Sequence, residues 1–290
     1  MMAPSRKRRK TFLLVIPSFE DIFHSYYAGE IIKGVSLAAT RLKADILIHI
    51  TDRFSHKDWL DSHVMDRNYI DGIIFGDIDS DVQIAKKAIA RHIPTIVLNN
   101  FLAEPFNCIA IDNYKATFDV IDHLVRLKHT RIATIAGDLT TQAGIARLQG
   151  FQDAMAKHRL EVPRNYITEG GFLRTPAREA AQKLLKLKNR PTAIFAASDV
   201  MALEVMDVAK TLGVRVPEEL SVVGFDDNPI AASSSVALTT VYQPIVEMAR
   251  LGAEYLKQIS IGQAKLPVKI LLPARLIVRK SSMTCAVSAS

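Results

Sequence analysis

The sequence contains few cysteines for its length, and this excludes whole classes of protein. Only Cys108 and Cys285 occur among 290 residues, and no Cys-x-x-Cys pair is present. A disulfide-stabilised scaffold, or a cysteine-based zinc or redox site, needs more cysteines at closer spacing. Cys108 lies in an apolar run, where an isolated thiol behaves as a small buried hydrophobic residue.

Long hydrophobic runs are also missing. No segment approaches the ~20 apolar residues of a membrane-spanning helix. The apolar run 11–16 follows a basic stretch, as in a secretory signal, but it is shorter than the ~7–15 residues of a signal core. Pro17 and Glu20 follow it at once. We therefore expect a soluble, cytoplasmic protein with no membrane partner.

Motifs of common enzymes and cofactor sites are missing as well. The sequence has no phosphate loop, no G-x-G-x-x-G, no H-E-x-x-H and no G-x-S-x-G. Three alternating aspartates at 77–81 resemble a calcium loop, but Val82 replaces its glycine and Ala88 its final glutamate. Asp226 and Asp227 are adjacent, and neighbours on an extended strand point to opposite sides. We expect no catalytic residue, no metal and no cofactor.

Positive charge is in excess, but it is concentrated in one place. The net charge is +7, and residues 6–10 are five consecutive cations, which leaves about +2 for the rest of the chain. We interpret this run as a solvated linker, with non-specific contact to phosphates as the alternative. The near-neutral remainder suits a polar, uncharged or weakly anionic ligand.

Short apolar runs alternate with longer amphipathic segments along the chain. The runs rich in Val, Ile and Phe predict buried strands at 11–16, 45–50, 72–75, 95–98, 109–111, 131–136, 193–196 and 221–224. The amphipathic segments predict helices at 26–41, 56–69, 81–91, 114–128, 140–158, 176–187, 198–212 and 244–259. This alternation indicates an α/β fold with parallel sheets. It leaves open whether the strands close into one barrel or form two doubly wound sheets.

Ten short motifs follow one another between residues 69 and 281. In chain order they are YIDGII (69–74), IPTIVL (93–98), IDN (111–113), HL with KHTRIA (123–124 and 128–133), RLQGF (147–151), RPTAIFA (190–196), SDVMA (198–202), LSVVGFDD (220–227), LTTV (238–241) and LIVRKS (276–281). In this order and spacing they resemble the effector-binding core of the lactose/galactose repressor (LacI/GalR) family of transcriptional regulators, and the resemblance spans about residues 11–283.

The resemblance implies a periplasmic-binding-protein-like body of type I. Such a body has two doubly wound parallel-sheet subdomains, joined by three crossover strands, and binds a small effector in the cleft. The implied subdomains are residues 11–127 plus 244–268 and residues 129–242 plus 270–283. Residues 1–10 are then a basic tail or linker and residues 284–290 a flexible tail. The resemblance thus favours two sheets over a barrel.

The N-terminus departs from the family pattern. Family members carry a helix-turn-helix headpiece and a hinge helix before this core, whereas here only residues 1–10 precede the first predicted strand. No helix-turn-helix fits in ten residues, and Pro4 with five consecutive cations disfavours a helix there. We expect either a truncated repressor or a natural core without its own DNA-reading head. Operator DNA is an expected partner only where the intact protein has a headpiece.

The resemblance also implies effector-binding residues in the second subdomain. The family's arginine at the position of Arg147 binds effector hydroxyls or carboxylates, and the counterpart of Asp226 accepts hydrogen bonds from ligand hydroxyls. The alternatives are a solvated ion pair for Arg147 and a helix cap or Arg147 salt bridge for Asp226. Phe172 either stacks on a sugar or base or is a core aromatic. Ser198 caps its helix or binds effector, and Gln243 binds ligand or fixes the crossover.

In the first subdomain the implied candidates are Asp21, Phe23 and Tyr27, on the loop and helix start after the first strand, and Asn99 at another strand end. The family commonly has Asn-Pro-Phe near the first three. Here segment 20–27 is longer and more acidic. Effector identity therefore does not carry over from the family to this chain.

Together these observations predict a cytoplasmic sensor of a sugar, sugar-like or nucleoside-like effector. Cleft binding would change lobe closure and, in an intact homodimeric regulator, DNA binding. A periplasmic-type sugar-binding protein for transport is the alternative, against which the missing signal peptide counts. An enzyme on the same scaffold is a third reading, but the sequence offers no nucleophile–base constellation for it.

Overall fold

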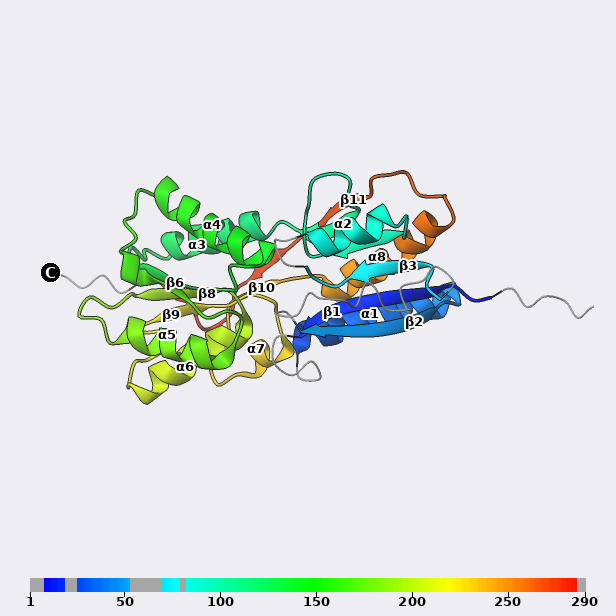
Figure 1. Ribbon diagram of the computed structural model, residues 1–290. Coiled ribbons are helices and arrows are strands. Elements are labelled where there is room, and N and C mark those ends of the chain that lie inside the picture. Colours follow the sequence, from blue (N-terminus) through cyan, green and yellow to red (C-terminus); the bar gives the residue numbers. More distant parts are fainter. Residues whose placement is uncertain (1–7, 19–24, 53–68, 79–81, 286–290) are drawn as a thin grey trace, which may run out of the picture. The chain divides into compact units, whose positions relative to one another are not determined.

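The computed structural model describes residues 8–18, 25–52, 69–78 and 82–285, and the chain divides into two units. Unit 1 comprises Met1–Ala110 and Pro244–Leu272, and unit 2 comprises Ile111–Gln243 and Pro273–Ser290. The chain therefore passes between the units three times, and we call these places the first (110/111), second (243/244) and third (272/273) crossings. The predicted α/β fold with two parallel sheets is confirmed (Figure 1).

Unit 1 is built on one sheet with helices on both faces. The sheet order is β11 (Lys269–Leu272), β5 (Cys108–Ile111), β4 (Thr95–Leu98), β3 (Gly72–Phe75), β1 (Thr11–Ser18) and β2 (Asp45–Asp52). On β1, Phe12, Leu14 and Ile16 pack with α1 (Tyr26–Leu42) and α8 (Ile245–Ser260), while Leu13 and Val15 lie in the core that contains α2 (Gln83–Ala90). Successive side chains point to opposite faces, so a strand covered on both faces must be apolar throughout.

The contact between α1 and α8 gives a first prediction. A Cβ built on Gly34 of α1 would lie 2.3 Å from the carbonyl oxygen of Val246 and 2.6 Å from Cβ of Ala249. Gly34→Ala should therefore force the helices apart and lower the free energy of unfolding by about 1–3 kcal/mol. Gly29→Ala, on the same helix with open space around it, should be neutral or stabilise by up to about 1 kcal/mol. Urea denaturation of both variants measures this, and equal effects would contradict the packing.

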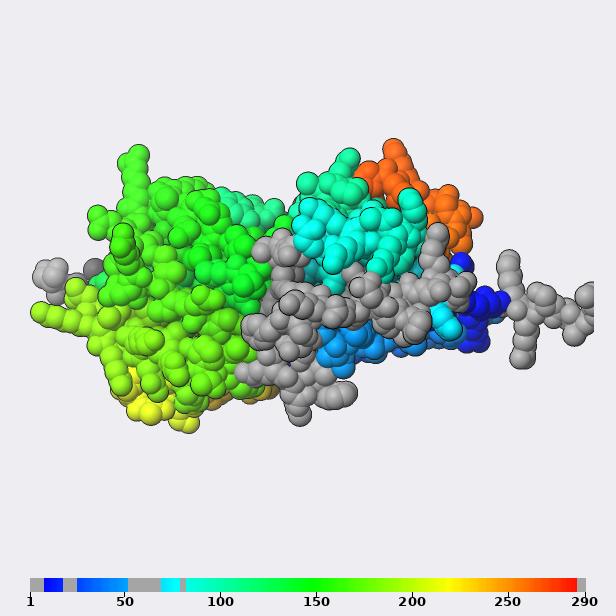
Figure 2. All heavy atoms as spheres, viewed as in Figure 1, coloured from blue at the N-terminus to red at the C-terminus, as the bar shows by residue number. Residues whose placement is uncertain are grey.

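Unit 2 repeats the layered plan with a smaller sheet. Its order is β7 (Ile167–Glu169), β6 (Ile132–Ala136), β8 (Ala193–Ala196) and β9 (Ser221–Val223), all parallel. The pair α5 (Arg174–Leu185) and α6 (Asp199–Thr211) packs on one face, and the pair α3 (Asn113–Arg126) and α4 (Gln142–Lys157) on the other (Figure 1). The short helix α7 is Pro229–Ser233, and β10 (Thr240–Tyr242) pairs antiparallel with β12 (Arg275–Ile277). On the face drawn in Figure 2, the surface of unit 2 comes from the part of the chain that carries α4, α5 and α6.

All eight predicted strands are present, and the differences have simple causes. The elements β7, β10, β11, β12 and α7 were not predicted, because runs of three to five residues, several of them half-exposed, carry too little pattern. The predicted helix at 56–69 lies almost wholly outside the described residues. None of the described helices is long and apolar enough to cross a membrane.

The unit boundaries differ from those that the resemblance implies. Residues 111–127 were expected in the first subdomain, but they belong to unit 2. The reason is the packing of α3, whose buried residues Val120, Ile121 and Leu124 lie on the helix that contacts α4. The third crossing likewise comes at 272/273 rather than near 269, because β11 joins the sheet of unit 1 beside β5.

Candidate functional site

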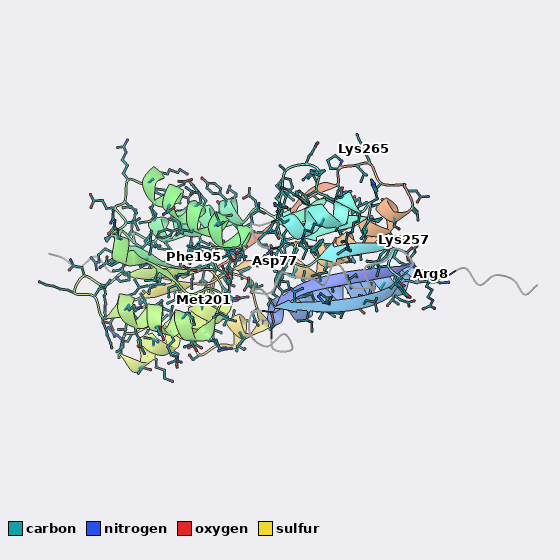
Figure 3. All side chains as sticks on the ribbon, viewed as in Figure 1. Arg8, Asp77, Phe195, Met201, Lys257 and Lys265 are labelled. Atoms are coloured by element: carbon teal, nitrogen blue, oxygen red, sulfur yellow. The ribbon has the colours of Figure 1, made fainter. Side chains whose placement is uncertain are left out.

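Unit 2 gathers polar side chains at the carboxyl edge of its sheet, where loops follow β6, β8 and β9. This is the edge where ligands bind in open α/β sheets. The loop after β6 leads into α4, which begins because the hydroxyl of Thr141 accepts a hydrogen bond from the backbone N–H of Gly144 (3.0 Å). Arg147 lies one turn further on. Behind the edge, Phe195 of β8 and Met201 of α6 are fully buried in unit 2 (Figure 3).

Arg147 is buried and held in one orientation. Its residue exposure is 3%. Its Nε donates to Oδ1 of Asn113 (2.9 Å), and its Nη1 donates to the carbonyl oxygen of Ala197 (2.5 Å). The guanidinium carbon lies 3.6 Å from the centre of the Phe225 ring and 5.7 Å from that of Phe172. The alternative of a solvated surface arginine is therefore wrong, since a buried guanidinium stacked on aromatic rings is a fixed set of donors.

Asp226 faces this guanidinium without a direct hydrogen bond to it. One carboxylate oxygen of Asp226 lies 3.9 Å from Nη1 of Arg147, and the same oxygen accepts a hydrogen bond from Nε2 of Gln243 (2.6 Å). Burial raises the pKa of Asp226 to about 6, although Arg147 and Gln243 both act to lower it. The neighbouring Asp227 turns away to Arg279 (2.6 Å). The two side chains thus separate as expected, but through positive φ angles of 124° and 55° rather than through an extended strand.

Of the two polar atoms in the side-chain amide of Gln243, only the nitrogen has a hydrogen-bond partner among the described residues. The side chain is buried (3% exposed), and its nitrogen donates to Asp226. Among the described residues, no donor lies within hydrogen-bond distance of its buried Oε1. A buried acceptor without a partner costs about 1–3 kcal/mol, so this atom is a natural place for a ligand donor.

Phe172 lies against the backbone of the loop after β6. A Cβ on Gly137 would lie 2.1 Å from the tip of the Phe172 ring, so only glycine leaves room for the ring here. Phe172 has a φ of 64°, and its ring packs on the edge of the unit 2 core while remaining half-buried. The ring is therefore partly a core aromatic and partly exposed near Arg147.

Ser198 and Asp199 stabilise the site from behind. The hydroxyl of Ser198 accepts from the backbone N–H of Met201 (3.3 Å), so it caps α6 as one of the two alternatives expected. Asp199 is fully buried and accepts hydrogen bonds from the Thr240 hydroxyl (2.5 Å) and the Asn228 backbone N–H (2.8 Å). Burial and then the charge of Asp226 raise the pKa of Asp199 well above its ordinary value.

The raised pKa of Asp226 predicts a pH-dependent stability. A carboxyl whose pKa is higher in the folded state takes up a proton on folding between its ordinary pKa of 3.8 and about 6. The free energy of unfolding therefore falls as pH rises through this window. Asp226→Asn should remove this contribution. The free energy of unfolding of wild type, measured relative to that of the variant, should therefore fall by up to about 3 kcal/mol from pH 4 to pH 6.5. Urea denaturation at several pH values measures it, and a constant difference would contradict the burial of this carboxyl.

Of the residues expected to bind effector in the first subdomain, the structure of unit 1 describes Tyr27 and Asn99. The hydroxyl of Tyr27 donates to the carbonyl oxygen of Gly76 (2.7 Å), just after β3. Asn99 follows β4 with a φ of 63°; it is buried, and within the described part of the chain its Oδ1 has no hydrogen-bond donor. Asp77 lies at the end of the unit 1 sheet opposite to Arg8 (Figure 3). Asp21 and Phe23 lie outside the described residues.

Two contributors to the cluster were not singled out from the sequence. Asn113 is the third residue of the IDN motif, and Phe225 directly precedes Asp226. Both residues lie in motifs of the family resemblance, but only the contacts in the folded structure show that they hold the guanidinium of Arg147. No group of three or more His, Cys, Asp or Glu side chains that could hold a metal occurs in the part of the chain that the structure describes. The arrangement offers fixed donors on Arg147, a carboxylate acceptor on Asp226, an oxygen of Gln243 that has no donor among the described residues, and aromatic rings. This combination suits ligand binding.

Comparisons with known proteins agree with this architecture. The family model of the periplasmic binding protein-like domain matches residues 121–282. The transcriptional regulator DegA of Bacillus subtilis is 34% identical over 95% of this chain and 82% of its own length. A solved complex of the transcriptional regulator CelR with cellobiose is 27% identical, with a TM-score of 0.84 over 94% of this chain and 85% of that chain. A lac repressor dimer, bound to operator and the anti-inducer ONPF, is 25% identical, with a TM-score of 0.83 over 96% of both chains. The chain therefore belongs to the LacI family of transcriptional regulators, of which it carries the periplasmic-binding-protein-like effector core.

Proposed function

We propose that this chain senses a neutral, polyhydroxylated small molecule, a sugar or a sugar-like or nucleoside-like compound, which binds at Arg147, Asp226 and Gln243. The observation that carries the proposal is the buried Oε1 of Gln243, which has no donor among the described residues although its amide nitrogen is bound to Asp226. A ligand hydroxyl can donate to that oxygen and accept from the guanidinium.

The charge of the cluster supports a neutral ligand. One guanidinium and one carboxylate face each other at 3.9 Å, so a strongly charged ligand would leave one of them opposed by a like charge. A hydroxyl group serves both, because it accepts from Arg147 and donates to Asp226. The guanidinium carbon lies 3.6 Å from the centre of the Phe225 ring and 5.7 Å from that of Phe172. The half-buried Phe172 can stack on the apolar face of a sugar or base. The CelR neighbour is a cellobiose complex.

Binding in this proposal serves regulation, with no turnover of the ligand. The relative DegA is a transcriptional regulator, and the lac repressor neighbour is bound to operator. These comparisons favour a cytoplasmic regulator over the transport-type alternative. In the intact protein, effector binding would change lobe closure and thereby DNA binding.

A homodimer through unit 1 is part of the same proposal. Within the described residues β2 pairs only with β1, so it forms an edge of the sheet. Its Ile48 and Ile50 are 47% and 46% exposed, and Leu37 on α1 is 48% exposed. An edge strand with exposed aliphatic side chains is a surface that proteins normally cover.

If the dimer forms through β2, one charge introduced on this strand should disrupt it. Ile48→Lys should convert a dimer to a monomer in sedimentation velocity, because the lysine would have to be buried in the interface. Leu266→Lys is the matched control, since Leu266 is in unit 1, is 58% exposed and lies shortly before β11, the edge strand opposite to β2. A monomeric wild type, or an unchanged dimer in Ile48→Lys, would contradict this interface.

A thermal-shift screen tests the proposed ligand class. Wild-type protein is mixed with mono- and disaccharides, including cellobiose, with nucleosides, and with sugar phosphates as charged competitors. We expect a neutral sugar or nucleoside to raise Tm by several degrees, and Asp226→Asn to reduce the shift. Stabilisation by the phosphorylated compounds alone would contradict the neutral class, and turnover of a stabilising sugar would contradict the regulatory role.

A further inference from the structure

Two of the three crossings carry a side chain that is bound to a charge of the candidate site. Asn113 is the third residue after the first crossing and begins α3. It is buried (5% exposed), and its Oδ1 accepts from Nε of Arg147 (2.9 Å). Gln243 is the last residue before the second crossing, and its Nε2 donates to Asp226 (2.6 Å).

These contacts line up as a polar chain, Asn113–Arg147–Asp226–Gln243, within unit 2, in which an ion pair separates two hydrogen bonds. The two outer links are hydrogen bonds of 2.9 and 2.6 Å, while the central link, between Nη1 of Arg147 and Asp226, is 3.9 Å long. The outer links are therefore closed and the central link is open, since 3.9 Å is beyond a hydrogen bond. The chain joins two backbone segments that are 130 residues apart in sequence.

We propose that this polar chain couples the first and second crossings, with Asn113 as the positioning residue that connects Arg147 to the first. A ligand oxygen placed at the central link would hydrogen-bond to both charges and close the chain. Ligand occupancy would then tie together the two backbone segments whose dihedral angles must change when the units move. What fills the central link rests on the proposed function, whereas the coupling itself is a property of the ligand-free protein.

The contacts around Arg147 explain how Asn113 transmits a movement of the guanidinium to the backbone at the start of α3. The guanidinium is confined by the Ala197 carbonyl oxygen and the Phe225 ring. Asn113 joins it to the backbone at the start of α3, where Asp112 caps the helix by accepting from the N–H of Lys115 (2.8 Å). A shift of the guanidinium therefore acts on the backbone beside the first crossing.

Hydrogen–deuterium exchange of the ligand-free protein tests the coupling. Asn113→Ala should speed amide exchange near its own position and also, severalfold, in segment 240–248 around the second crossing. In an Asp226→Asn background the central charge pair is gone, so the same substitution should leave exchange of segment 240–248 unchanged. Asn113→Asp keeps an acceptor oxygen for Arg147 and should restore slow exchange. Thr117→Val is the control, because it alters another buried polar side chain on α3.

The outcomes separate the coupling from the proposed function. An effect of Asn113→Ala confined to α3, or one that persists at 240–248 in the Asp226→Asn background, would overturn the coupling and leave ligand binding to be judged by the thermal-shift screen. The same propagation in Thr117→Val would also overturn it, because general loosening of α3 would then be sufficient. Far-ultraviolet circular dichroism confirms that each variant is folded. If Asn113→Ala does not fold, Asn113→Leu replaces it, because leucine has a similar volume but no acceptor for Nε of Arg147.

Discussion

Replacing Arg147 with alanine is expected to weaken binding of the sugar or nucleoside selected by the screen at least 100-fold. The side chain is 3% exposed and its guanidinium is held by Asn113, Ala197 and the Phe225 ring. Donors fixed in this way bind ligand oxygens without a further ordering cost. A hydrogen bond to a charged group contributes about 1.5–3 kcal/mol, and two such bonds account for a loss of this size. Isothermal titration calorimetry measures the change.

Arg147→Lys is the matched variant for this experiment. It retains the charge beside Asp226, but it lacks the forked donors that reach Asn113 and Ala197 together. We expect it to bind more weakly than wild type and more tightly than Arg147→Ala. If Arg147→Ala folds and still binds the ligand with wild-type affinity, the assignment of this arginine is wrong.

The second large effect is expected from Gly224→Ala, which should lower the free energy of unfolding by about 3 kcal/mol. Gly224 lies between β9 and the Phe225–Asp226 pair. A Cβ there would lie 2.3 Å from Oδ1 of Asp199 and 3.0 Å from Cδ2 of Leu238. Asp199 cannot move aside freely, because Thr240 and Asn228 hold its carboxylate. Overpacking of a rigid buried site costs about 1–3 kcal/mol or more. The substitution should also weaken ligand binding, since it displaces Phe225 and Asp226.

A double-mutant cycle identifies the cause of this loss. Asp199→Ala alone should destabilise, since it removes the acceptor of the buried Thr240 hydroxyl and of the partly buried Asn228 N–H. In Gly224→Ala/Asp199→Ala the obstructing oxygen is absent, so the combined loss should be smaller than the sum of the single losses. Strictly additive losses in the free energy of unfolding, measured by chemical denaturation, would show that the methyl group introduced at position 224 does not clash with Asp199.

The core strands could be predicted from the sequence because they are covered on both faces. Continuous apolar runs such as Gly72–Phe75 and Thr95–Leu98 have few alternatives once helices surround them. The short strands β10 and β12 could not be predicted, because each has only three residues and is defined by its antiparallel partner from a distant part of the chain. The boundary near residue 127 was misplaced for a similar reason. The apolar face of α3 shows that the helix packs, but α4 as its partner is visible only in the fold.

The candidate site followed from the sequence only in part. The family resemblance implied Arg147, Asp226, Phe172 and Gln243 as candidates, and the structure brings them to one edge of the unit 2 sheet. The contacts that orient them depend on tertiary structure. Asn113 is 34 residues from Arg147, and neither spacing nor composition indicates that an amide there accepts from the guanidinium.

The most direct test of the account is the pH dependence of ligand affinity in wild type and Asp226→Asn. Asp226 must be ionised to accept a ligand hydroxyl fully, and burial raises its pKa to about 6. Calorimetric titration with the sugar or nucleoside selected by the screen should therefore show wild-type affinity rising about tenfold from pH 5 to pH 7. The Asp226→Asn affinity should be weaker and flat over the same range. An equal rise in both proteins, or equal affinity at pH 7, would contradict the claim that Asp226 and its neighbours form the effector site.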